Sequence, residues 1–193
     1  MGNYIFEKKI LLDVLEDDAS QVRSSHDFGL DILPRLVKEG RKVYAYDFRR
    51  NRIPDTVKGE EPSYWRDIGT IDAYFEANMD LRKADPSLNL YNRNWPIRTV
   101  SYGDPPAKFV FDEEGRRAMA LNSIVAEGTI ISGSVVRNSV IGRNVRIHSF
   151  CSIEDAILMN RVEVGRGCRL RRLIVDKNVY VPPETEIGYN PEM

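Results

Sequence analysis

The stretch that decides the fold is VAEGTIISGSVVRNSVIGRNVRIHSFCSIEDAILMNRVEVGRGCRLRRLIVDKNVYVPPETEI, residues 125–187. Its aliphatic residues recur every sixteen or seventeen positions, in steps of five or six. They form three registers: Val125, Ile141, Leu158 and Val175; Ile131, Ile147, Val164 and Val181; and Val136, Ile153, Leu170 and Ile187. A helix of about 3.6 residues per turn would scatter these side chains around its axis. The period instead predicts a triangular solenoid of parallel strands, with each register forming a stack of inward residues.

Glycine and short polar residues separate the registers, where the backbone of such a coil has to turn. They are Gly128, Gly133, Gly142, Gly165, Asn144, Arg161 and Asn178. Cys151 and Cys168 stand seventeen residues apart, so we expect them on adjacent coils, about 5 Å apart by strand spacing. That distance permits a disulfide, but the absence of a secretory context favours two reduced, buried thiols. The cysteines show no zinc-ligand spacing.

The composition is that of an ordinary water-soluble protein: 193 residues, 42% hydrophobic and 30% charged. The net charge of −1 argues against a nucleic-acid or anionic-membrane partner. No apolar run approaches the length of a transmembrane helix. The N-terminal MGNYIFEKK lacks the basic-then-apolar order of a secretory signal, so we expect a cytoplasmic protein.

The first half predicts alternating strands and helices. The expected strands are Tyr4–Phe6, Val43–Phe48 and Tyr64–Ile68. The expected helices are Lys8–Leu15, one that starts near Pro34 and stops at Gly40, and Thr70–Arg82 with Thr70 as its cap. Residues 49–63 are expected to form an exposed loop. The predicted domains are therefore 1–83, a partial α/β layer; 84–106, a proline-rich linker or docking segment; and 107–193, the solenoid.

Six segments in unbroken order resemble bacterial glucose-1-phosphate adenylyltransferase (ADP-glucose pyrophosphorylase). They are MGNYIF, SSHDFGLDILP, SYWRDIGTIDAYFEANMDL, LYNRNWPIRT, PPAKFV, and the run from LNSIV to CRLRRLIVDK. The resemblance implies a remnant of a dinucleotide-binding-like nucleotidyltransferase domain followed by a left-handed parallel β-helix. It also implies the reaction of ATP with glucose 1-phosphate to give ADP-glucose and pyrophosphate for glycogen synthesis. Mg²⁺, a homotetramer and allosteric control by a phosphorylated effector are further expectations from the family.

The chain also departs from the family pattern. The Gly-rich nucleotide loop, the first metal-binding aspartate and the Glu-Lys pair that grips the sugar phosphate have no counterpart in the sequence. Met1 matches a methionine inside the family's catalytic domain, and the family continues beyond the position of Met193. We therefore expect a cloned fragment or a truncated gene product that does not turn over substrate alone.

Asp67, within Tyr64–Thr70, is the leading candidate for chemistry. The residues alone favour a helix-start aspartate stabilised by the dipole of the following helix. The resemblance makes it the second of two aspartates on the metal. Mg²⁺ in phosphoryl-transfer sites is held by one or two carboxylates plus substrate phosphates.

Three residues are candidates for the sugar-phosphate pocket by the same resemblance. Asp27 would accept hydrogen bonds from the sugar hydroxyls, although turn or N-cap aspartates are common in such sequences. Trp65 and Tyr4 would wall the pocket, and their alternative is a role as core aromatics. His26 is interpreted as structural, because a phosphate nucleophile is already ionised at pH 7.

Arg143, Arg161 and Lys177 are spaced to share one corner of successive coils, with Arg169, Arg171 and Arg172 one strand before Lys177. A basic corner can bind phosphate groups. The resemblance assigns effector binding to the position of Lys177, and the alternative is ordinary solvation.

Two other functions remain open. A hexapeptide-repeat acyltransferase would need a histidine base, for which the solenoid offers only His148. A non-catalytic regulatory or assembly subunit would use the solenoid for oligomer contacts.

Overall fold

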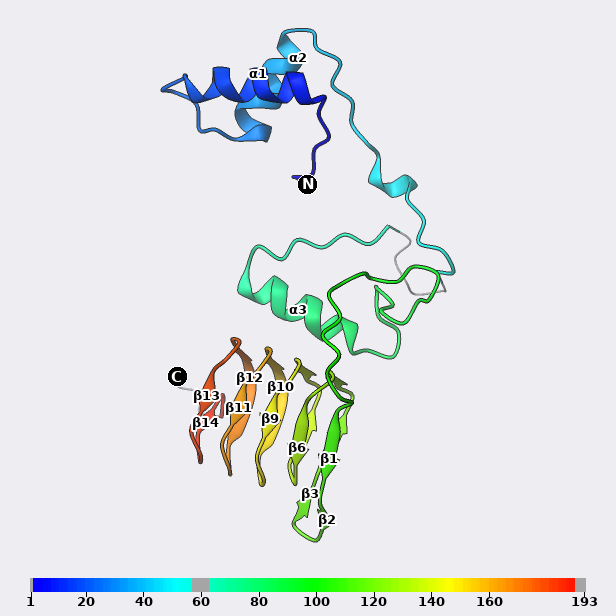
Figure 1. Cartoon of the computed structure of the whole chain (residues 1–193), viewed down its shortest axis with the longest axis vertical. Helices are drawn as coiled ribbons and strands as arrows, with labels where there is room; N and C mark the ends of the chain where they lie inside the picture. The colour runs from blue at the N-terminus through cyan, green and yellow to red at the C-terminus, as the bar shows by residue number, and fades with distance from the viewer. Residues whose placement is uncertain (1, 57–62, 190–193) are drawn as a thin grey trace. The chain divides into compact units, whose positions relative to one another are not determined.

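The computed structural model describes residues 2–56 and 63–189. The chain divides into two compact units, Met1–Phe48 and Arg49–Met193 (Figure 1). Residues 57–62 of the expected loop lie outside the described residues. A short 3₁₀ turn, η2 (Phe48–Arg50), lies where the two units meet in sequence.

The N-terminal unit is a small helical cluster. It contains α1 (Lys8–Ala19), the π-helical turn η1 (Phe28–Ile32) and α2 (Leu33–Lys38). The expected helices are confirmed: Pro34 lies in the first turn of α2, and Gly40 follows its end with φ 71°. The buried core holds Val14, Ile32 and Leu36, with Phe6, Ile10 and Phe28 packed around them.

The strands expected at Tyr4–Phe6, Val43–Phe48 and Tyr64–Ile68 were wrong. None of these segments is paired into a sheet, and Phe48 belongs to the turn η2. An extended segment becomes a strand only when a neighbour accepts and donates its backbone hydrogen bonds. Among the described residues outside the solenoid no such ladder forms, and Ile5 and Tyr44 are exposed instead.

The second unit contains α3 (Ile71–Leu81) and the solenoid. The first solenoid strands are β1 (Lys108–Val110), β2 (Asp112–Glu113), β3 (Arg116–Arg117), β4 (Met119–Leu121), β5 (Ile124–Val125), β6 (Ile130–Ser132) and β7 (Val135–Arg137). They are followed by β8 (Val140–Ile141), β9 (Arg146–Ile147), β10 (Ser152–Leu158), β11 (Glu163–Val164), β12 (Arg169–Val175), β13 (Tyr180–Val181) and β14 (Glu186–Ile187).

The solenoid has three parallel faces. One is β1-β6-β9-β11-β13, and a second is β4-β7-β10-β12-β14. The third face pairs β5 with β8, β8 with the end of β10, and the end of β10 with the end of β12. The long strands β10 and β12 take part in two faces because each bends around a corner. Among the described strands, β2 and β3 alone pair in the antiparallel direction.

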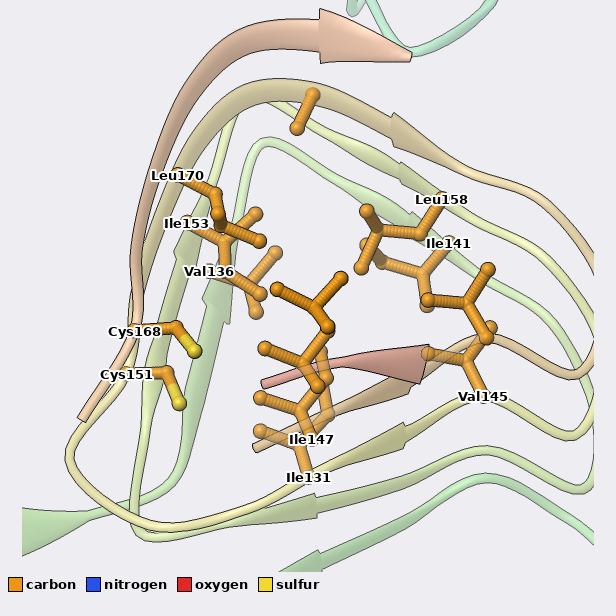
Figure 2. Packing of buried hydrophobic residues seen from close by; sticks show 14 residues of the cluster. Ile131, Val136, Ile141, Val145, Ile147, Cys151, Ile153, Leu158, Cys168 and Leu170 are labelled. Atoms are coloured by element: carbon orange, nitrogen blue, oxygen red, sulfur yellow. The ribbon is translucent and has the colours of Figure 1, made fainter. Parts of the chain in front are cut away.

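All three predicted registers are confirmed as stacked pairs. Ile141 pairs with Val125 and Leu158 on one face. The other two faces repeat this pattern with Ile131–Ile147–Val164–Val181 and Val136–Ile153–Leu170–Ile187. Figure 2 shows the stacks converging on the solenoid axis. Residues in the middle coils are almost fully buried, whereas Ile187 at the last coil is 47% exposed.

Left-handed backbone at each corner turns the chain between faces. The corner residues with positive φ form three columns: Asn122, Asn138, Asp155 and Arg172; Gly128, Asn144, Arg161 and Asn178; and Gly133, Phe150, Gly167 and Glu184. Glycine and asparagine adopt this conformation most readily, which is why they mark the repeat in the sequence. Position 165 needs glycine for a different reason, because a Cβ there would lie 2.5 Å from the backbone nitrogen of Pro183 in the next coil.

Buried hydroxyl groups join successive coils. Ser134 donates to the His148 carbonyl at 2.6 Å and accepts from the Cys151 amide at 2.8 Å. Ser139 donates to the Arg137 carbonyl at 2.6 Å and accepts from the Ala156 amide at 3.1 Å. Both serines are at most 1% exposed. Each hydroxyl therefore satisfies backbone groups that the turns leave without a strand partner.

Cys151 and Cys168 are free, buried and stacked on adjacent coils (Figure 2). Their thiols donate to the carbonyls of Gly165 and Pro182, both at 3.0 Å. Burial raises the pKa of the Cys151 thiol above its ordinary value.

Candidate functional site

In the N-terminal unit, the structure brings Asp27 and Tyr4 to the same turn. Asp27 caps η1: its Oδ1 accepts hydrogen bonds from the amides of Gly29 at 2.7 Å and Leu30 at 2.8 Å. A Cβ on Gly29 would lie 3.3 Å from this oxygen and 3.9 Å from the Tyr4 hydroxyl. The carboxylate and the phenol therefore flank Gly29, where both can reach a small polar ligand.

Tyr4 is not a core aromatic. Its ring stacks on Phe28 at a centroid distance of 5.3 Å, and the residue is 39% exposed. Phe28 faces the core cluster from the other direction. The Tyr4 ring therefore stacks on Phe28 at the surface of the unit.

The segment before Asp27 is held by two other carboxylates. Asp18 on α1 accepts from Ser24 Oγ at 2.7 Å and contacts His26 Nδ1 at 2.8 Å. Asp31 accepts from the Ser25 hydroxyl and from the amides of Ser25 and Asp27. The hydrogen bond from Ser24, followed by that from His26, holds the pKa of Asp18 below its usual range. Bonds from Ser25 and from the Asp27 amide lower the pKa of Asp31 in the same way.

In the second unit, Asp67 is an exposed turn residue that precedes the helix cap. Its Oδ1 accepts from the Gly69 amide at 3.1 Å. Thr70 is the cap of α3, because its hydroxyl accepts from the Ala73 amide at 3.1 Å. Asp67 therefore does not belong to the first turn of α3. Trp65, two residues earlier, is 43% exposed rather than part of a core.

A cavity of about 810 Å³ lies between the start of α3 and the solenoid. Its α3 side includes Ile68, Gly69 and Thr70, which directly follow Asp67. Its solenoid side includes Arg172 and Asp176. The rest of the lining is Ile71, Asp72, Tyr74, Phe75, Met159, Leu173 and Ile174.

An apolar outer stripe explains why α3 packs on this face. Ile124, Val140, Ile157 and Ile174 stand next to the inward register and are paired from coil to coil. They point outward, yet Ile157 is only 3% exposed because α3 lies against β10. The consecutive aliphatic pairs at 124–125, 140–141, 157–158 and 174–175 are the sequence signal for a strand covered on both sides.

The three predicted effector residues differ in their surroundings. Arg143 is held by Asp104, contacts Glu127 at 3.4 Å and lies 3.5 Å from the Tyr102 ring centroid. The hydrogen bond from Arg143, together with one from Asn144, lowers the pKa of Asp104. Arg143 thus anchors the end of the 84–106 segment to the solenoid.

Arg161 and Lys177 are more open. Arg161 Nε donates to Asn178 Oδ1 at 2.6 Å, and Lys177 is exposed next to Asp176 of the cavity lining. Arg143 is aligned with Asn160, whose Oδ1 accepts from the Arg143 amide at 3.0 Å. Arg161 is therefore one position out of the column that the spacing suggested.

Arg172 is the one member of the predicted group Arg169, Arg171 and Arg172 that lines the cavity. Arg169 and Arg171 are paired with Glu186 and Glu154, but Arg172 lines the cavity from a left-handed corner with φ 50°. Its signal was the sixteen- or seventeen-residue spacing from Asn122, Asn138 and Asp155.

The donor set suits a divalent cation only in part. The described residues contain no group of three or more histidine, cysteine or carboxylate side chains arranged to hold a metal. Asp67 offers a single exposed carboxylate, which fits an ion that also takes phosphate oxygens and water. No helix in the described ranges is long and apolar enough to cross a membrane.

Two family models match different parts of the chain. Residues 1–84 match the family model "Nucleotidyl transferase", and residues 105–193 match "GlmU-like, C-terminal hexapeptide". The chain is 52% identical to the glucose-1-phosphate adenylyltransferase of Deinococcus radiodurans over 193 residues, which are 100% of this chain and 46% of the relative. The enzyme of the same name from Thermus thermophilus is 53% identical over 194 residues, again 100% of this chain and 46% of the relative. The chain thus spans about half the length of these relatives.

Proposed function

Because the chain belongs to the glucose-1-phosphate adenylyltransferase family by similarity along its whole length, we propose that it carries the sugar-phosphate and metal side of that active site. The reaction would join ATP and glucose 1-phosphate to give ADP-glucose and pyrophosphate, in glycogen synthesis. The observation that carries the proposal is the placement of Asp67 as an exposed turn carboxylate beside the cavity.

Each named residue has a defined task. Asp27, with Oδ1 fixed by two amides, accepts from sugar hydroxyls through its remaining lone pairs. Tyr4 and Trp65 limit the sugar's orientation. Asp67 would hold Mg²⁺, which neutralises charge on the phosphates. The phosphate oxygen of glucose 1-phosphate attacks the α-phosphorus of ATP, the bond to pyrophosphate breaks, and no proton transfer is needed because the nucleophile is already ionised.

This chain is expected to bind without turning over. Incubation with ATP, glucose 1-phosphate and Mg²⁺ should give no ADP-glucose, because the nucleotide loop has no counterpart in these residues. Glucose 1-phosphate should instead shift the amide resonances of Gly29 and Leu30, and Asp27→Asn should abolish the shift. Measurable ADP-glucose formation would show that turnover does not need the nucleotide loop. Gly29 and Leu30 resonances that do not change with glucose 1-phosphate would reject the sugar-phosphate site.

The proposal includes an effector site at the solenoid side of the cavity. Arg172 lines the cavity, Lys177 directly follows Asp176 of the lining, and Arg161 lies on the preceding coil. Arg143 takes part only as an anchor of the 84–106 segment. Fructose 1,6-bisphosphate or inorganic phosphate should bind the wild type more tightly than Lys177→Ala or Arg172→Ala. The exposed Arg137→Ala is the matched control, and equal, negligible binding by all four proteins would reject the site.

A regulatory or assembly subunit is the second candidate. It is favoured by one observation: the cavity and the described coils of the solenoid lie in a single unit. Homotetramer formation and a cytoplasmic location belong to either candidate. Effector binding without glucose 1-phosphate binding would favour this second function.

A further inference from the structure

The two proposed ligand-binding aspartates occur in the same four-residue arrangement. His26-Asp27-Phe28-Gly29 and Arg66-Asp67-Ile68-Gly69 each place a basic residue before the aspartate and glycine two residues after it. In both, aspartate Oδ1 accepts from the glycine amide, at 2.7 Å and 3.1 Å. In both, a Cβ on the glycine would lie 3.3 Å from that oxygen. In each turn the glycine amide donates to Oδ1, and the second carboxylate oxygen, Oδ2, can still accept a hydrogen bond from a ligand.

In the N-terminal unit, the basic residue is held by a buried carboxylate on a helix. Asp18 of α1 is 4% exposed, and its Oδ2 lies 2.8 Å from His26 Nδ1. Ser24 donates to the other oxygen of Asp18. His26 has φ 58°, a conformation that costs a non-glycine residue energy unless contacts hold it. Asp18 therefore supports the left-handed turn that leads into Asp27.

In the second unit, a buried carboxylate does the same for Arg66. Asp80 of α3 is 6% exposed and accepts from Lys83 Nζ at 2.8 Å and from the Ser87 amide at 3.1 Å. Arg66 Nη2 lies 3.8 Å from Asp80 Oδ2 and donates to Ser87 Oγ at 3.1 Å. Arg66, which stands between Trp65 and Asp67, is thereby tied to the far end of α3.

We propose that Asp18 and Asp80 are positioning residues, which fix His26 and Arg66 and so aim the carboxylates of Asp27 and Asp67 at their ligands. The identity of these ligands rests on the proposed function, whereas the positioning of the two carboxylates does not. Groups that orient a ligand-binding carboxylate matter because a small misplacement weakens binding. Both buried carboxylates stay ionised for this role. Bonds from Ser24 and His26 lower the pKa of Asp18. Burial raises the pKa of Asp80, but bonds from Lys83 and Ser87 outweigh it and the net shift is downward.

The first test needs no ligand. In amide NMR spectra of the whole chain, Asp18→Asn should shift the Gly29 and Leu30 resonances and leave Gly69 in place. Asp80→Asn should shift Gly69 and leave Gly29 in place. Glu16→Gln and Glu76→Gln remove exposed carboxylates from the same helices and should move neither glycine. The proposal would be overturned if the Gly29 and Gly69 resonances did not shift in the Asp18→Asn and Asp80→Asn variants. It would also be overturned if the exposed glutamate substitutions shifted them equally.

The second test separates positioning from general stability. Mn²⁺, a paramagnetic probe, should broaden the Gly69 resonance of the wild type, and Asp80→Asn should weaken its binding by roughly tenfold. Unchanged Mn²⁺ affinity despite a shifted Gly69 resonance would make Asp80 merely structural and reject its positioning role. If the wild type binds no Mn²⁺, the proposed metal role of Asp67 fails, while the amide test still decides the geometry.

Two exposed substitutions guard against simple unfolding. His26→Ala removes the contact with Asp18 without touching a core residue, because the His26 side chain is 58% exposed. It should reproduce the Gly29 shift of Asp18→Asn, and His26→Gln, which keeps a donor, should restore much of the wild-type position. Equal spectra for His26→Ala and wild type would reject the role of Asp18.

Discussion

The solenoid and the N-terminal unit use extended chain in opposite ways. From β4 onward, each solenoid strand finds a partner one coil away, sixteen or seventeen residues along the chain, as in the pairing of Ile153 with Val136 and Leu170. Tyr4–Phe6 and Val43–Phe48 have strand-like sequences, but within the described ranges neither segment joins a β-sheet. A segment with high strand propensity therefore forms a strand only where the fold places a second strand beside it.

The largest effects are expected when the cores of the two units are damaged separately. Leu170 is fully buried in the stacked core of the solenoid, and Leu36 belongs to the small core of the other unit. Leu170→Ala should lower the free energy of unfolding of the solenoid by about 2–5 kcal/mol. Amide hydrogen exchange measures this for each unit. Leu36→Ala should accelerate exchange in α1 and spare β10, and a uniform effect of either change would show that the units unfold together.

A smaller effect is expected from the buried hydroxyls that join the coils. Ser134→Ala leaves the Cys151 amide and the His148 carbonyl without this partner. The loss should cost about 1–3 kcal/mol, measured by denaturant unfolding. Ser152→Ala, at an outward position of β10, is the control and should have little effect. A Ser134→Ala variant as stable as the control would show that the buried hydroxyls do not stabilise the corners.

The N-terminal unit should weaken in acid. Asp18 has a lowered pKa in the folded unit, so it stabilises that unit above the ordinary aspartate pKa of about 3.9, and this stabilisation is lost as the pH falls through the lower folded value. Asp31 acts in the same direction. Asp18→Asn should therefore reduce the pH dependence of amide exchange in α1 and leave that of the solenoid core unchanged. An undiminished acid response of α1 would rule out Asp18 as its source.

The smallest expected effect concerns the cysteines. With both thiols buried and the pKa of Cys151 raised, the folded solenoid should react slowly with a thiol reagent, and the Leu170→Ala variant should react faster. Mass spectrometry of the labelled chain checks this. Rapid labelling of the wild type would show that the coils around Cys151 and Cys168 open far more often than the packed core implies.

Short sequence motifs predicted the parts of the candidate site that depend on neighbouring residues. Thr70 as the cap of α3, and Asp27 and Asp67 as turn aspartates, follow from short-range patterns. Asp18 and Asp80 could not be found this way, because their partners lie eight and fourteen residues away and depend on how each helix folds back. The anchoring of Arg143 by Asp104 spans thirty-nine residues and likewise has no local signal.

The sequence by itself determined the solenoid, its three registers and the corners that glycine and asparagine mark, because a strict period fixes each strand's neighbour and each turn's conformation. Only the tertiary structure decided that α3 lies on the doubly apolar face, that Arg172 rather than Arg143 reaches the cavity, and that two buried aspartates support the proposed ligand carboxylates. These outcomes depend on which distant groups meet after burial. No periodic pattern records that pairing.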